Sequence, residues 1–266
     1  MKKVNVIIFA VVLLLFVSCN KSSNPVNNNS NQNSAAVYYP GNTGSNYNYS
    51  VQIDSLGGQS SQGERTVSFA GSTTIDNTSY FIQSNSTVLP NSTTNTNSYF
   101  RRTDGGVFFY IDTTGLYRFI PASLAASLTV EADKELGVLT SNLDVNNPWK
   151  AYKLNVKYGS LFSLSIIDLT AYYQGTEDLT LNLQSGQVNE TAEKINYVFT
   201  LSIPDTTDFN QSNTSTFEST AWFVKDIGLV KCQGNLTVAN AISGYDIDFD
   251  DTTKTIIQNL TSYEIK

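Results

Sequence analysis

The chain has 266 residues, with 16 Lys and Arg against 23 Asp and Glu, no His and a formal net charge of −7. Phosphate backbones repel an acidic chain, so this balance argues against a nucleic-acid partner. Without His the chain can form neither a Ser-His-Asp nor a Cys-His catalytic site, and it has no imidazole to bind a metal.

Residues 1–18 have the pattern of a secretory signal peptide. Lys2 and Lys3 precede an uncharged stretch over residues 4–17, which is the order of the basic and apolar regions in such peptides. A helix that spans a bilayer needs roughly 18 or more apolar residues, so this stretch is too short to be a transmembrane segment. We therefore expect the chain to be exported and residues 1–18 to be removed.

The sequence Phe16-Val17-Ser18-Cys19 resembles a bacterial lipobox, in which a small residue precedes the cysteine that receives the lipid. The resemblance implies a diacylglyceryl group on the Cys19 sulfur, cleavage before Cys19 and acylation of the new amine. A single acyl chain gives only marginal membrane binding, whereas two or more anchor a protein stably. The predicted partner at this end of the chain is therefore a membrane, bound through the lipid.

The residues around Cys19 also bear on which membrane is bound. Ser18 before the cysteine and Asn20-Lys21 after it resemble lipoproteins of Bacteroidetes-like bacteria. Acidic residues soon after the cysteine often mark surface export in that group, and residues 20–36 contain none. The resemblance thus implies the cell envelope, at the periplasmic face of the outer membrane.

Composition divides the exported chain into two parts. After Cys19, residues 20–36 are mostly Asn, Ser, Pro and Gln, and such a segment cannot bury enough apolar surface to offset its ordering entropy. We interpret 19–36 as the lipidated cysteine and a disordered tether. Residues 37–266 are rich in Tyr, Phe, Leu, Ile and Val, and their length suits a single β domain.

Alternation of apolar and polar residues dominates the part beyond residue 37. Such a period of two is typical of half-buried strands in antiparallel sheets. Together with short runs that are apolar on both faces, it predicts strands at residues 47–53, 65–70, 80–83, 107–111, 152–158, 161–169, 179–183, 195–203, 221–230, 245–249 and 254–265.

Turn residues separate these strands, as at Gly57-Gly58, Gln174-Gly175 and Ser185-Gly186. Residues 121–142 form the one segment suited to a helix, and the Ser/Thr/Asn-rich residues 84–98 predict a long loop. The predicted fold class is all-β: a single antiparallel, strongly curved sheet or open barrel with at most one short helix.

Three blocks of sequence resemble a group of uncharacterised secreted β-rich bacterial proteins. They are Tyr38-Tyr39-Pro40, the strand-turn-strand block over residues 175–180 and the block over residues 222–231. The resemblance implies an antiparallel sheet curved toward an open barrel, similar in outline to periplasmic lipid-carrier folds. It supplies no catalytic residues.

Four Asp-Ser or Asp-Thr pairs resemble the O-glycosylation sites of Bacteroidetes, with Ser55, Thr113, Thr206 and Thr252 as the acceptors. The alternative is that each pair only forms a turn. Cys232 has no partner once Cys19 carries lipid, which excludes an intrachain disulfide and favours a buried, inert thiol.

Metal and cofactor binding find little support in the sequence. The alternating acids 246, 248 and 250 resemble a calcium loop. However, Asp251 stands where such a loop requires Gly, and Ile257 stands where it requires a bidentate Glu. We therefore predict neither a metal site nor a cofactor. A glycosidase would need two facing carboxylates, and the sequence cannot say which of five acids would pair: Glu131, Asp133, Glu135, Glu177 and Asp178.

The leading functional hypothesis is a membrane-anchored, non-enzymatic envelope protein that binds or carries an apolar or amphipathic ligand in the concave face of its sheet. A structural or adhesive module that binds glycan or protein is the second hypothesis, and a carboxylate-based carbohydrate-active enzyme is the third. A carrier requires a deep apolar cavity. An adhesive module requires exposed aromatic side chains, and an enzyme requires a pair of acids that face each other across a cleft.

Overall fold

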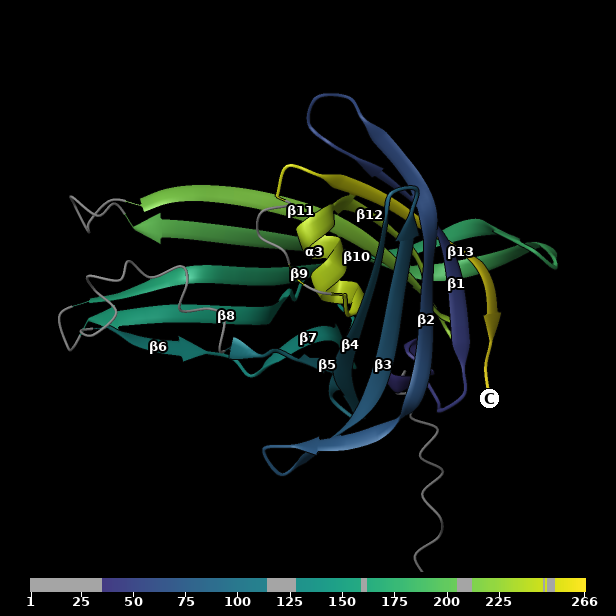
Figure 1. Cartoon of the computed structure of the whole chain (residues 1–266). Coiled ribbons are helices and arrows are strands. Elements are labelled where there is room, and N and C mark those ends of the chain that lie inside the picture. The colour runs from purple at the N-terminus through teal and green to yellow at the C-terminus, as the bar shows by residue number, and fades with distance from the viewer. Residues whose placement is uncertain (1–34, 114–127, 159–161, 205–211, 246, 248–251) are drawn as a thin grey trace, which may run out of the picture. The chain divides into compact units, whose positions relative to one another are not determined.

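Thirteen strands form one antiparallel sheet in the computed structural model, which describes residues 35–113, 128–158, 162–204, 212–245, 247 and 252–266 (Figure 1). The described part also contains a 3-10 turn, η1 (Ala35–Tyr38), and a helix, α3 (Leu236–Ser243). The strands are β1 (Asn46–Asp54), β2 (Ser60–Ile75), β3 (Thr78–Leu89), β4 (Ser92–Thr103), β5 (Gly106–Tyr110), β6 (Thr129–Ala132), β7 (Glu135–Thr140), β8 (Trp149–Tyr158), β9 (Phe162–Leu183), β10 (Gly186–Pro204), β11 (Ser212–Val224), β12 (Gly228–Asn235) and β13 (Thr255–Glu264).

The sheet is mostly a meander in which consecutive strands pair. Its strand order is β6-β8-β9-β10-β11-β12-β13-β1-β2-β3-β4-β5-β7. The last strand, β13, pairs antiparallel with the first, β1, so the two ends of the described chain lie side by side in the middle of the sheet. This arrangement confirms the predicted single antiparallel sheet.

The sheet curves until its two ends approach each other. β7 is at one end of the strand order and β8 is next to the other, yet the Trp149 indole of β8 donates to the Gly137 carbonyl of β7 at 2.9 Å. No ladder joins these two strands, so the sheet is not closed into a barrel. β-Bulges at Gly71 in β2 and Gly175 in β9, with φ of +117° and +89°, coincide with register shifts and add local bend and twist.

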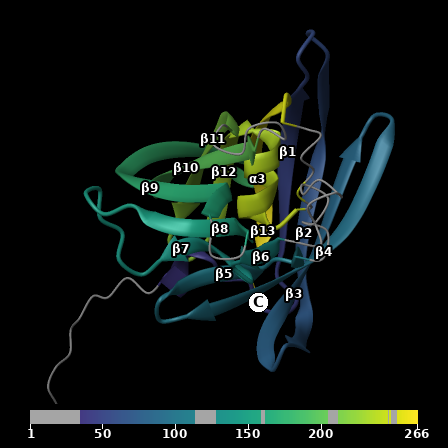
Figure 2. The same cartoon turned by 90° about the vertical axis from the view of Figure 1, so that its left-hand side faces the viewer.

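Helix α3 lies inside the curve of the sheet, with β8 to β11 on one side and β1 to β4 on the other (Figure 2). It begins after Asn235, whose side-chain oxygen accepts from the Val238 amide at 3.3 Å, as an N-cap should. It ends at Gly244, which adopts φ of +76°. All eight helical residues are buried, so the helix is part of the core.

Helix α3 was not predicted from the sequence. The helix expected in residues 121–142 is absent from the part of that segment that the structure describes. Within residues 121–142 the described part, from 128 onward, contains strands β6 and β7, because Leu136, Val138 and Leu139 pack into the core in extended chain. Helix α3 has only eight residues, fewer than the roughly 11–18 over which a helical period can be recognised. Its polar residues Thr237, Asn240 and Ser243 are buried together with its apolar ones.

Residues 84–98 were also predicted wrongly. They form most of the hairpin of β3 and β4 rather than a loop. Thr is well suited to strands, and the inward-facing Gln83 and Asn85 are buried polar residues that bond to other core groups. A polar composition was therefore mistaken for a loop.

Three strand boundaries also differ from expectation. Gln174-Gly175 is a bulge inside the continuous strand β9, so neither the turn nor the strand-turn-strand at 175–180 exists. The segment 221–230 is divided between β11 and β12 by a turn at Asp226, with φ of +61°. In the predicted strand 245–249, Tyr245 and Ile247 lie in no strand, and the other residues lie outside the described part.

None of the helices in the described residues is both long enough and apolar enough to span a membrane.

Candidate functional site

An open cavity of about 890 Å³ occupies the concave side of the sheet. Its walls come from strands β1 to β5, β7 to β10 and helix α3, because every second residue of each strand points inward. This volume lies in the range of roughly 300–1,000 Å³ that is usual for small-molecule sites. Much of the lining is aliphatic or aromatic, as at Ile53, Leu89, Phe109, Leu136, Ile167 and Leu169.

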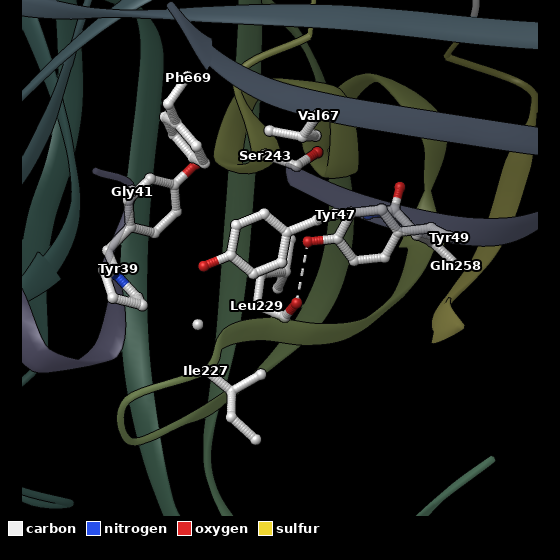
Figure 3. A pocket seen from close by; sticks show the side chains of 12 residues that line it. Tyr39, Gly41, Tyr47, Tyr49, Val67, Phe69, Ile227, Leu229, Ser243 and Gln258 are labelled. Atoms are coloured by element: carbon white, nitrogen blue, oxygen red, sulfur yellow. Dashed lines mark hydrogen bonds between the residues drawn. The ribbon is translucent and has the colours of Figure 1, made fainter. Parts of the chain in front are cut away.

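A second, much smaller gap is lined by Tyr39, Tyr47, Tyr49 and other residues shown in Figure 3. Tyr39, Tyr47 and Tyr49 point toward it, and the Tyr49 hydroxyl donates to the Leu229 carbonyl at 3.0 Å. The gap is about 20 Å³, which is enough for about one water molecule. It is a packing defect rather than a ligand site.

Arg65 of β2 is the one charged side chain buried in the cavity wall among the described residues, with 3% exposure. Its guanidinium donates from Nη1 to the Gln258 side-chain oxygen at 2.9 Å and from Nη2 to that of Asn240 at 2.6 Å. Its Cζ lies 4.0 Å from the centre of the Tyr245 ring. Burial lowers the pKa of Arg65, yet an arginine stays protonated in proteins. A charge thus sits among neutral partners.

Polar atoms without partners gather around the same cavity. Seven buried side-chain N and O atoms lack a hydrogen-bond partner among the described residues, and four of these belong to side chains that line it. They are Arg65 Nε, Thr96 Oγ1 and the hydroxyls of Tyr152 and Tyr245. Burial raises the pKa of both tyrosines, so both remain neutral donors. An unpaired buried polar group costs on the order of 1–3 kcal/mol, so a bound group that satisfies several of them is favoured.

The helix end at the cavity is held by side chains of β3. Gln83 Nε2 donates to the Ser243 carbonyl at 2.8 Å, and Asn85 Nδ2 donates to the Gly244 carbonyl at 2.6 Å. These carbonyls would otherwise lack intrahelical donors. Gln83 and Asn85, in the strand pair that the sequence predicted as a loop, therefore hold the end of α3, which forms one wall of the cavity.

A polar groove of about 510 Å³ lies along β5, β7 and β8. Arg101 donates from Nε and Nη2 to the two oxygens of Glu135, both at 2.5 Å, and the Tyr80 hydroxyl donates to Glu135 at 2.7 Å. The Arg101 guanidinium holds the pKa of the Glu135 carboxyl below its ordinary value. Glu135 is therefore ionised at neutral pH and is unsuited to be a general acid.

The five acids that the sequence offered as candidates for a glycosidase pair mostly bond to groups of opposite charge or to hydroxyls. An acid held in this way has less freedom to face a second acid across a cleft. Besides Glu135, Glu131 pairs with Lys157 at 2.7 Å, Glu177 with Lys194 at 2.8 Å, and Asp178 accepts from the Thr191 hydroxyl at 2.7 Å, while Asp133 lines the groove.

The predicted modification sites in the described part of the chain are spread out, and none of them lines the cavity. Ser55 lies in the turn after β1, Thr113 three residues after β5 and Thr252 three residues before β13, and each is half-buried. Cys19 and Thr206 lie outside the described residues. No metal-binding group of three or more acids or cysteines occurs in the described part of the chain.

Cys232 is fully buried on β12, as the sequence indicated. Burial raises the pKa of its thiol to about 12, so the reactive thiolate is scarce at neutral pH.

Arg65 was not identified from the sequence, although a signal existed. Arg65 is in phase with Val67 and Phe69, two apolar residues of the same strand, and all three are buried. A charged residue on the apolar phase of a strand predicts a buried charge. Asn240, Gln258 and Tyr245 come from distant segments and gave no such signal.

Comparisons with known proteins add a likeness of fold. No family model and no curated protein sequence matches the chain. A solved structure of a candidate lipoprotein from Parabacteroides distasonis is 12% identical over 85% of this chain and 98% of its own, with a TM-score of 0.43. A candidate exported protein with a YmcC-like fold from Bacteroides fragilis is 11% identical over 85% of this chain and 97% of its own, with a TM-score of 0.42.

Both neighbours are proteins of Bacteroidetes. Their low identity and TM-scores assign neither a family nor a function to this chain.

Proposed function

We propose that the protein is an exported, lipid-anchored envelope protein that binds or carries an amphipathic ligand without chemical conversion. The observation that carries this proposal is the cavity of about 890 Å³ inside the curved sheet. It combines an apolar lining with four buried polar atoms that lack partners among the described residues. A mostly apolar pocket with a few convergent polar groups is the usual form of a small-molecule site.

The test of binding is native mass spectrometry of the protein, produced from the full chain in a bacterial host and purified in a mild non-ionic detergent. We expect a co-purifying mass of lipid size that is released on denaturation. A variant with Leu169→Arg, which places a charge in the apolar wall, is expected to lose that mass. An apo mass for the wild type, unchanged after incubation with envelope lipids, would refute the proposal.

We also propose that Cys19 carries the lipid anchor, at the periplasmic face of the outer membrane. We expect Cys19→Ala to abolish incorporation of radiolabelled palmitate into the protein, because the thiol and the following cleavage are required for acylation. The matched control is Cys232→Ala, which should be labelled as the wild type is. Labelling of the Cys19→Ala protein would show that the anchor lies elsewhere or is absent.

The alternative of an adhesive module is less well supported. Among the described residues the most exposed aromatic side chains are Tyr172 on β9 and Tyr263 on β13, at 42% and 38%, and single exposed apolar residues are normal on any protein surface. In the polar groove, Glu135 already bonds to Arg101 and Tyr80. Four of the seven unpaired buried atoms belong to side chains that line the cavity, so the cavity is the better candidate.

A further inference from the structure

This inference rests on the proposed function and names the chemistry of the ligand. We propose that the ligand of the cavity is a long-chain monocarboxylic acid whose carboxylate binds Arg65 and the Tyr245 hydroxyl, while its hydrocarbon chain lies against the apolar wall formed by Leu136, Ile167 and Leu169.

The buried positive charge of Arg65 favours an anionic ligand. Transfer of an unpaired charge out of water is costly, and buried charges are therefore nearly always paired. The two bonds of Arg65 to Gln258 and Asn240 engage neutral amide oxygens, and no carboxylate of the described residues bonds to it. A ligand that brings a negative charge would offset this cost.

The geometry of Arg65 suits a carboxylate. Of the five N–H groups of a guanidinium, the two bonds to Gln258 and Asn240 use one on each terminal nitrogen. The Nε–H and the second hydrogens of the terminal nitrogens remain, and Nε has no partner in the described part. A guanidinium edge with two free N–H groups can donate two parallel hydrogen bonds to the oxygens of a carboxylate.

Tyr245 fixes the guanidinium and adds a donor. Its ring stacks beneath Arg65 at 4.0 Å, which restrains the plane of the fork and favours the cation. Tyr245 lines the same cavity, and its hydroxyl is buried next to it without a partner among the described residues. One cation and one neutral donor match a singly charged head group better than a doubly charged phosphate.

The apolar wall accounts for the rest of the ligand. Leu136, Ile167 and Leu169 line the cavity and are almost fully buried. They come from β7 and β9, whereas Arg65 comes from β2, so the charged and apolar regions of the lining belong to different parts of the sheet. A ligand with a charged head and an apolar tail matches that division.

The test compares three ligands with the same hydrocarbon chain. The protein from the full chain is incubated with equal concentrations of palmitate, hexadecanol and hexadecyl phosphate, and the bound masses are counted by native mass spectrometry. We expect palmitate to be retained at least about tenfold over hexadecanol, since hydrogen bonds to charged groups are the stronger ones. Arg65→Met should remove this preference and still retain hexadecanol.

A second variant covers the event that Arg65→Met does not fold. Tyr245→Phe keeps the ring beneath the guanidinium and removes only the hydroxyl, so it should fold and should retain less palmitate than the wild type, with hexadecanol unchanged. Circular dichroism confirms the fold of each variant. The control Tyr263→Phe removes a hydroxyl outside the cavity and should leave both ligands unaffected.

The outcomes separate this inference from the proposed function. Equal retention of palmitate and hexadecanol by the wild type would overturn the role of Arg65 and leave a binding cavity in place. Stronger retention of hexadecyl phosphate than of palmitate would overturn the choice of a carboxylate. Retention of none of the three, together with an apo mass for the purified protein, would overturn the proposed function itself.

Discussion

Gly244→Ala is expected to lower the free energy of unfolding by about 3 kcal/mol. Gly244 has φ of +76° at the end of α3, where an L side chain is strained. A Cβ at this position would lie 2.5 Å from Phe109 Cε1, 2.7 Å from Gln83 Nε2 and 2.8 Å from Ser98 Oγ. Strain and overlap act together, because Phe109 and Gln83 are buried and Gln83 is held by its bonds to Asn85 and the Ser243 carbonyl.

The effect is measured by urea unfolding followed by circular dichroism. Gly58→Ala is the matched control, because Gly58 has φ of +92° with nothing within 4 Å of the added Cβ. It should cost only about 1 kcal/mol, from backbone strain alone. Equal losses in the two variants would mean that the wall of the cavity near Gly244 is not closely packed.

Phe100→Ala is expected to lower the free energy of unfolding by about 4 kcal/mol. Phe100 is fully buried on β4, and its ring centre lies 5.2 Å from Tyr39, 5.4 Å from Phe69 and 5.9 Å from Phe109. Its removal leaves a cavity among rings that come from β2, β5 and the residue directly after η1, and this cavity cannot collapse without moving the sheet.

The matched control for this prediction is Tyr172→Ala, since Tyr172 is an aromatic residue of β9 with 42% exposure. A surface substitution of this kind should change the free energy of unfolding by about 0.5 kcal/mol or less. Both variants are compared with the wild type in urea at constant pH. A loss below about 1 kcal/mol for Phe100→Ala would contradict close packing of the aromatic rings around Phe100.

The sequence predicted the strands well where their inner and outer faces differ in polarity. In β10, the apolar Ile195, Tyr197 and Phe199 are buried, with Asn196 on the other face, as alternation requires. The prediction failed in the β3 and β4 hairpin, where buried positions such as Gln83 and Asn85 are polar. It failed at α3 because every side chain of that helix is buried.

The sequence by itself therefore determined the all-β class, the single antiparallel sheet and the burial of Cys232, because alternation and composition are local properties that one strand can display. Only the tertiary structure decided the cavity and its polar groups. The polar groups come from three separate segments: Arg65 from β2, Asn240 and Tyr245 from α3 and the residues just after it, and Gln258 from β13. They meet because β13 returns to pair with β1 and because α3 folds into the concave face. Contacts of that kind depend on how the sheet curves, which no local pattern of residues encodes.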